Sequence, residues 1–129
     1  MKKFLVALIT FSSFVAGAAL ALQLGDTPTL PAALTDSFGK SQPLEKSAFR
    51  VFFFYPAASS SGCTTQNIEY TKRYAEFISA KAQVFGVSSD DAKEQCAFIE
   101  AQKLKVPQIP DQKNVLGRIF EVGTILRYY

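Results

Sequence analysis

The sequence predicts an α/β domain with a parallel sheet at its core and helices packed outside the sheet. Two apolar runs have the composition of buried strands, and each leads into a stretch with helical periodicity. Strand–helix–strand–helix alternation implies right-handed crossovers, which place successive strands parallel in one sheet. The 129 residues, 48% hydrophobic and 19% charged, are enough for one domain with a sizeable core.

A small hairpin and a buried strand are expected in the first half of the chain. Residues 22–46 are loop-rich, and the run 36–40, Asp-Ser-Phe-Gly-Lys, is a turn signal between two short apolar patches, which predicts the hairpin. Residues 51–55, Val-Phe-Phe-Phe-Tyr, are an unbroken aromatic and β-branched run, typical of a strand buried on both faces.

Two long helices are expected to follow, separated by a second strand. Apolar residues at three- and four-residue steps predict the first helix over 63–82, and 83–88 is the second strand. Ser88 or Ser89 is a suitable N-cap for the second helix, which runs to about Leu104.

The segments after residue 88 also predict a solvated cluster of acidic residues, a short extended piece and a short helix. We interpret the acidic run Asp90, Asp91 and Glu94 as a solvated helix face. Residues 106–110 form a short extended piece, and 115–122 form one or two helical turns.

The N-terminus has the pattern of a secretory signal peptide over residues 1–21. Lys2 and Lys3 supply a positive start, an apolar run follows, and two A-x-A sites end it, the second placing the mature start at Leu22. The mature domain would then be 22–129, exported to a periplasm, the exterior or an organelle lumen. An uncleaved membrane anchor is the alternative, since the apolar run approaches spanning length.

Composition excludes several classes of chemistry. The chain has no histidine, which rules out Ser-His-Asp and Cys-His machinery and His-ligated metals. Two cysteines without a ligand cluster argue against a zinc or iron–sulfur site. Removing Lys2 and Lys3 from the 14 basic residues leaves 12 against 11 acidic ones, so net charge near +1 gives no argument for nucleic acid or a membrane surface.

Cys63 is the candidate reactive group. It follows a strand, Pro56 and a small-residue loop, and it opens a helix whose dipole and outward N–H groups stabilise a thiolate. Pro56 has no N–H group to donate, and its apolar ring is expected to pack beside the thiol and limit the access of water to it. Ser60 can accept one hydrogen bond and donate another, and the Gly62 and Cys63 N–H groups can act as preorganised donors. The alternative is a structural half-cystine or an inert core thiol.

Pro56, Ser60 and Cys63 match P-x-x-x-[ST]-x-x-C, which resembles the peroxidatic motif of the peroxiredoxins. The flanking Phe-Tyr-Pro and Gly-Cys-Thr-Thr resemble the bacterioferritin-comigratory, or peroxiredoxin Q, branch, and the likeness spans about 25–122. The resemblance implies a thioredoxin-like fold, a central mixed β-sheet flanked by helices. It also implies a monomeric thiol peroxidase for hydrogen peroxide and alkyl hydroperoxides, without cofactor or metal. Members of the branch continue with further strands, so this chain is expected to be truncated at its C-terminus.

The resemblance implies roles for two more residues. A resolving cysteine lies on the second helix in some members, and Cys96 is the candidate here, its disulfide with Cys63 being reduced by a thioredoxin-like donor. Arg127 falls near an arginine that favours the thiolate in the family.

Three alternatives to this reading remain. An external thiol would replace Cys96 in a one-cysteine mechanism. A non-catalytic protein would hold a structural Cys63–Cys96 disulfide, as exported proteins often do. A thiol–disulfide oxidoreductase ranks low because no second cysteine makes C-x-x-C with Cys63.

Overall fold

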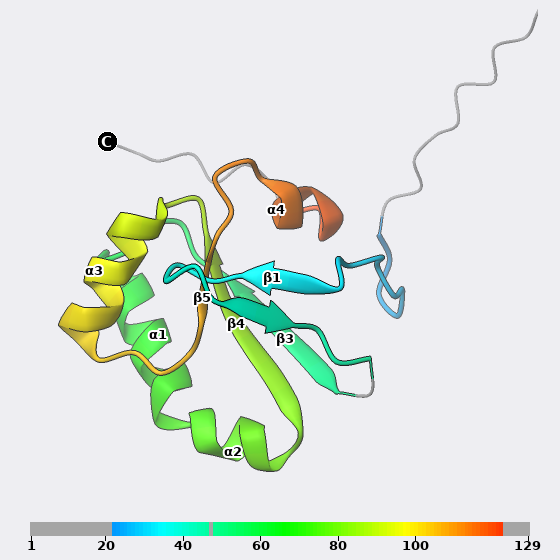
Figure 1. Ribbon diagram of the computed structural model, residues 1–129, viewed down its shortest axis with the longest axis horizontal. Coiled ribbons are helices and arrows are strands. Elements are labelled where there is room, and N and C mark those ends of the chain that lie inside the picture. The colour runs from blue at the N-terminus through cyan, green and yellow to red at the C-terminus, as the bar shows by residue number, and fades with distance from the viewer. Residues whose placement is uncertain (1–21, 47, 123–129) are drawn as a thin grey trace, which may run out of the picture.

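The computed structural model describes residues 22–46 and 48–122, and a parallel sheet lies at their centre (Figure 1). The sheet has the order β3 (Phe49–Phe54), β4 (Ala82–Ser88) and β5 (Gln108–Pro110). Both pairings are parallel, with Phe54 opposite Val87 and Val87 opposite Ile109. The α/β class and the parallel core are therefore confirmed, whereas the predicted signal peptide lies outside the described residues.

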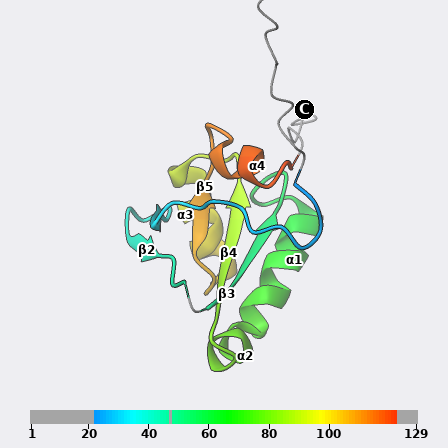
Figure 2. The same cartoon turned by 90° about the vertical axis from the view of Figure 1, so that its right-hand side faces the viewer.

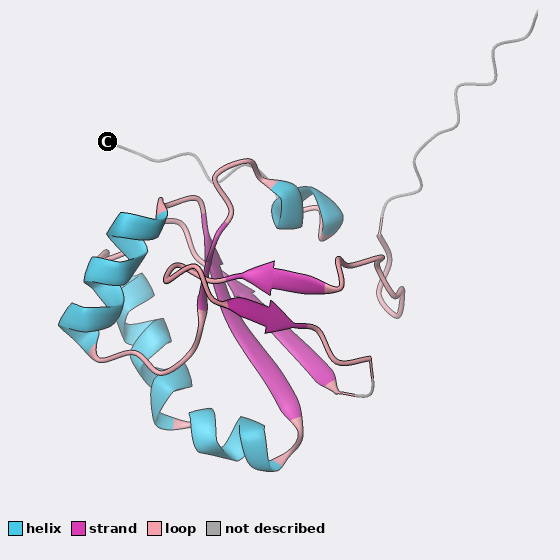
Figure 3. Ribbon diagram, in the orientation of Figure 1, coloured by secondary structure: helices cyan, strands magenta, loops and turns pink. Residues whose placement is uncertain are grey.

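The structure has two helices where the sequence predicted one over 63–82. α1 spans Ser61–Lys72 and α2 spans Tyr74–Ser79 (Figure 3). Arg73 separates them with φ −95° and ψ 6°, which interrupts the regular helix. The prediction of a single helix was wrong because the apolar residues keep their three- and four-residue spacing across Arg73, whereas the helical backbone is interrupted there.

The hairpin lies on the face of the sheet opposite to the two long helices (Figures 1 and 2). α1 and α3 (Ala92–Gln102) lie on one face, as the two orthogonal views agree (Figures 1 and 2). The other face carries the antiparallel pair β1 (Ala33–Thr35) and β2 (Ser41–Pro43), together with α4 (Val115–Ile119). The predicted hairpin is confirmed, and so is a helical turn after residue 115.

Alternation along the central strands separates two apolar cores, one on each face. The core under α1 and α3 takes Phe53 and Val84 from the strands and also contains Cys63. The core under the hairpin and α4 takes Phe85 and Val87 from β4. β4 is buried along almost its whole length, as expected of a strand covered on both faces. β3 is mostly half-buried, with Phe53 its buried residue, so the prediction of full burial on both faces was wrong for this strand.

The start of α3 corrects the prediction for the acidic run. Asp91, rather than Ser88 or Ser89, is the N-cap, and it forms a reciprocal capping box with Glu94. β4 continues to Ser88, so the helix starts later than expected. Asp90 is only 4% exposed, and its carboxylate turns into the protein instead of lying on a solvated face.

Candidate active site around Cys63

Cys63 lies in the first turn of α1, where the helix backbone has unused donors. Ser60 is the N-cap, with extended backbone (φ −70°, ψ 150°) and no capping hydrogen bond from its side chain. The first helical bond runs from the Thr64 N–H to the Ser60 carbonyl at 2.8 Å. The N–H groups of Ser61, Gly62 and Cys63 therefore precede the internal ladder of the helix and suit an anion or a polarised oxygen.

The Cys63 side chain is largely enclosed. It is 6% exposed and belongs to the apolar cluster that contains Tyr55, Phe98 and Val106. This enclosure favours a small reagent at the sulfur over a bulky one. Cys63 is a free thiol in the structure.

The loop between β3 and α1 brings Pro56 and Ser60 next to Cys63 in the chain, and both are exposed. Ala58, between these two residues, is half-buried and packs against the apolar cluster that contains Cys63. Ser59 has φ +65°, a left-handed conformation that strains a non-glycine residue and makes the sharp turn into the helix.

A chain of hydrogen bonds in the protein interior connects this loop to β4 and α3. The Ala58 N–H donates to Asp90 Oδ2 at 2.7 Å, and the Ser88 hydroxyl donates to the same oxygen at 2.7 Å. Gln95 Nε2, on α3, donates in turn to Ser88 Oγ at 2.9 Å. These hydrogen bonds were not predicted from the sequence, because they depend on β3 and β4 being parallel neighbours whose carboxyl ends meet at one edge of the sheet.

Tyr55 connects the same region to β5. Its side chain is completely buried, and its hydroxyl donates to Gln108 Oε1 at 2.8 Å. Burial raises the pKa of Tyr55 to about 12; a hydrogen bond with Ser88 opposes this shift, and the negative charges of Asp90 and Cys63 add to it. The Tyr55 hydroxyl is thus protonated at neutral pH and lies within electrostatic range of both Asp90 and Cys63.

Cys96 contacts the hairpin. It is a half-buried free thiol on α3, and its Sγ donates to the Ser37 carbonyl at 3.1 Å, in the turn between β1 and β2. The Ser37 N–H donates to the Gln108 carbonyl at 2.9 Å, so this turn reaches β5 as well. Pro56 and Ser60 thus lie on the loop that leads into α1 and Cys63 lies in its first turn, whereas the Cys96 thiol is directed to the hairpin turn. Arg127 lies outside the described residues.

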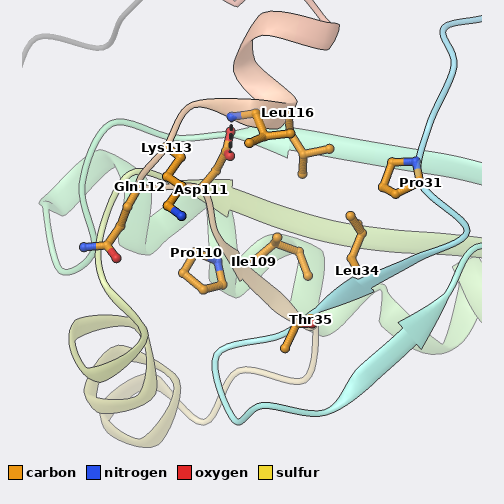
Figure 4. Close-up of a pocket in the computed structure, with 10 residues that line it drawn as sticks. Pro31, Leu34, Thr35, Ile109, Pro110, Asp111, Gln112, Lys113 and Leu116 are labelled. Carbon is orange, nitrogen blue, oxygen red and sulfur yellow. Dashed lines mark hydrogen bonds between the residues drawn. The ribbon is translucent and has the colours of Figure 1, made fainter.

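A cavity of about 310 Å³ lies away from Cys63, between the hairpin, the carboxyl end of β5 and α4 (Figure 4). Leu34, Ile109 and Leu116 give it apolar walls. Asp111 is also at its edge, but its carboxylate accepts the N–H groups of Val115 and Gly117 and so caps α4. The cavity has the character of a packing gap beside the hairpin.

The described residues form neither a cluster of metal ligands nor a membrane-spanning helix. Residues 22–46 and 48–122 bring no three cysteine or carboxylate side chains together as a possible cation site. In the same ranges, every helix is too short or too polar to cross a lipid bilayer.

Comparison with known proteins identifies the family. Residues 33–127 match the AhpC/TSA family. The chain is 36% identical over 72 residues to peroxiredoxin Bcp of Xanthomonas campestris pv. campestris, covering 56% of this chain and 45% of that protein. It is 36% identical over 102 residues to the chloroplastic peroxiredoxin Q of Suaeda salsa, covering 76% and 48%. The chain thus spans about half the length of these curated relatives.

Solved structures agree with the sequence matches. A structure of Xanthomonas campestris peroxiredoxin Q superposes with a TM-score of 0.65 at 33% identity, over 74% of this chain and 65% of that one. The peroxidoxin BcpB of Mycobacterium tuberculosis gives the same TM-score at 28% identity, over 74% and 64%. These likenesses confirm the thioredoxin-like peroxiredoxin fold, and with the family match they show that the chain belongs to the AhpC/TSA family.

Proposed function

We propose that this protein is a thiol-dependent peroxidase that reduces hydrogen peroxide and alkyl hydroperoxides at Cys63. The observation that carries the proposal is the position of this thiol at the start of α1, beside three N–H groups that precede the helical ladder and directly after the Pro56–Ser60 loop. A thiolate nucleophile and donors for a departing oxygen are what peroxide reduction requires.

In the first step, the Cys63 thiolate attacks one peroxide oxygen. A sulfur–oxygen bond forms, the oxygen–oxygen bond breaks, and the departing oxide takes a proton to leave as water or alcohol, with Cys63 as a sulfenic acid. The Ser60 hydroxyl accepts a hydrogen bond from one peroxide oxygen and donates a hydrogen bond to the other. The N–H groups of the first turn of α1 stabilise the negative charge that develops on the departing oxygen.

In the second step, the Cys96 thiol condenses with the sulfenic acid, which releases water and forms a disulfide. A thioredoxin-like dithiol donor supplies the two electrons that return both cysteines to thiols. Because Cys96 lies on α3 and its thiol engages Ser37, it must leave the hairpin turn and the two helices must loosen locally. The protein acts as a monomer after export and removal of residues 1–21, and without a metal or an organic cofactor.

Stopped-flow consumption of hydrogen peroxide by the reduced protein tests this function, with free thiols counted before and after. We expect rapid loss of two thiols per peroxide. Cys63→Ser should abolish the fast reaction, whereas Cys96→Ser should keep it and stop at a sulfenic acid that dimedone traps. Fast loss of one thiol with an unchanged Cys96 would instead support the one-cysteine mechanism.

The rival function is a non-catalytic scaffold with a structural Cys63–Cys96 disulfide. It predicts consumption no faster than that of a free thiol, together with a disulfide that forms without peroxide. Ser60→Ala and Ser60→Thr sharpen the comparison, since a peroxidase should lose rate with alanine and keep it with threonine. A scaffold should show the same slow rate in all three proteins.

A further inference from the structure

The strongest unexplained feature is a buried carboxylate beneath the Cys63 loop. Asp90 is almost fully buried, and Ser88 and Gln95, the other members of its hydrogen-bond chain, are buried too. A buried charge is costly unless it makes good hydrogen bonds. Here two short bonds, from the Ala58 N–H and the Ser88 hydroxyl, both at 2.7 Å, converge on one oxygen of this carboxylate.

The contact with Ala58 acts at a critical place in the loop. Ala58 is followed at once by the left-handed Ser59 and then by the N-cap Ser60. Its amide is therefore the last backbone group fixed from the protein interior before the chain turns into α1. Charge-assisted hydrogen bonds to backbone N–H groups are short and strong, so this one sets where the turn begins.

Asp90 also lies near the buried Tyr55 hydroxyl, because its negative charge adds to the rise in the pKa of Tyr55. Its hydrogen bond to the Ala58 amide connects this buried carboxylate directly to the loop that precedes Cys63.

We propose that Asp90 is a positioning residue for peroxide reduction: by holding the Ala58 amide, it fixes the loop so that Ser60 and the first-turn N–H groups meet the peroxide at Cys63. This inference rests on the proposed function. Ser88 on β4 and Gln95 on α3 extend the same support, and Gln95 Nε2 also donates to the Ile109 carbonyl on β5 at 3.1 Å.

The test compares two reactions of Cys63 in a Cys96→Ser background, where Cys63 is the remaining thiol. Reduction of hydrogen peroxide requires the aligned loop, whereas alkylation by iodoacetamide requires only an accessible thiolate. For Asp90→Ala we expect the peroxide rate constant to fall about 10- to 100-fold, as misplaced catalytic groups typically cause. The alkylation rate constant should change less than about threefold, because that reaction does not use the loop donors.

Two further variants separate positioning from general loosening. Asp90→Asn keeps an oxygen that accepts the Ala58 N–H, so it should retain most of the peroxide rate. Asp91→Ala is the matched control, because it removes the neighbouring carboxylate and breaks the α3 capping box without touching the loop. It should lower the urea midpoint and leave the ratio of the two rate constants unchanged.

Several results would overturn the inference. One is an equal fall of the peroxide and alkylation rate constants in Asp90→Ala. Another is a peroxide rate constant in Asp90→Asn as low as that of Asp90→Ala. A third is a fall in the ratio of the peroxide to the alkylation rate constant in Asp91→Ala as large as in Asp90→Ala. If Asp90→Ala does not fold, Ser88→Ala replaces it, with an expected fall of a few-fold in the peroxide rate alone. A parent protein that reacts no faster than a free thiol would refute the proposed function, whereas a fast parent with an equally fast Asp90→Ala would refute only the role of Asp90.

Discussion

Replacing Tyr55 by phenylalanine should change how the stability of this protein depends on alkaline pH. The Tyr55 hydroxyl is buried and donates to Gln108 Oε1. Phenylalanine keeps the ring in the core but leaves the buried Gln108 oxygen without its donor. At pH 8 this should reduce the free energy of unfolding by about 1–3 kcal/mol.

The pH effect follows from the raised pKa of Tyr55, from 10.0 to about 12. Between these values the folded protein holds a proton that the unfolded chain has released, so stability falls as pH rises. The contribution is fully present below pH 10 and is lost as pH passes through the folded pKa. The loss is about 1.4 kcal/mol at pH 11 and approaches about 2.7 kcal/mol above pH 12, at 1.36 kcal/mol per pKa unit.

Urea unfolding followed by far-ultraviolet circular dichroism at pH 8, 9, 10 and 11 measures both effects. Other ionising groups act alike in the parent and in Tyr55→Phe, so the difference between their free energies of unfolding isolates Tyr55. That difference should narrow by about 1.4 kcal/mol between pH 8 and pH 11. A difference that stays constant over this range would refute the reasoning, because it would mean that the hydroxyl ionises equally easily in both states.

Three further substitutions should change stability in directions that urea midpoints can measure. Phe98→Ala should cost about 3–5 kcal/mol, since this side chain is 1% exposed and packs against Tyr55; a cost below about 1 kcal/mol would contradict its place in the core. Gly86→Ala should cost about 1–3 kcal/mol, because the new Cβ would overlap the Gln108 carboxamide; an unchanged midpoint would show that Gln108 moves freely. Ser59→Gly should stabilise by up to about 1 kcal/mol, since relief of left-handed strain exceeds the added entropy of the unfolded chain, and a lower midpoint would speak against strain at φ +65°.

The sequence allowed the strands and the position of Cys63 to be predicted because their signals are local. The apolar run 51–55 overlaps β3, Gln83–Ser88 lies within β4, and Cys63 lies in the first turn of α1, which begins two residues earlier, at Ser61. Continuous apolar runs of this kind are typical of strands at the centre of an α/β fold. A proline and small residues between a strand and a helix likewise mark a tight loop.

The burial of Asp90 could not be read from the same signals. Beside Asp91 and Glu94 it has the appearance of a solvated charge, and two of the three indeed form the exposed start of α3. What distinguishes Asp90 is its contact with Ala58, 32 residues earlier in the chain. Such a contact depends on the pairing of β3 with β4, which local periodicity does not encode.

The direction of the Cys96 thiol depended on an even more distant segment. The family resemblance singled out Cys96 on the second helix but did not indicate what its thiol contacts. In the structure the thiol donates to the Ser37 carbonyl, 59 residues away in sequence, because the turn between β1 and β2 reaches both β5 and α3. No local sequence pattern around Cys96 or around Ser37 predicts this contact.

Because the Cys96 thiol donates to Ser37 in the turn between β1 and β2, the oxidation state of Cys96 affects how the hairpin on the other side of the sheet is held. A Cys96 engaged in a disulfide no longer donates to Ser37, so the turn loses this bond to α3 and keeps the Ser37 N–H bond to the Gln108 carbonyl on β5. A reductant that approaches the oxidised protein would then meet a looser hairpin than the reduced protein presents. The shape of the hairpin surface, in addition to the disulfide itself, would then distinguish the two redox forms.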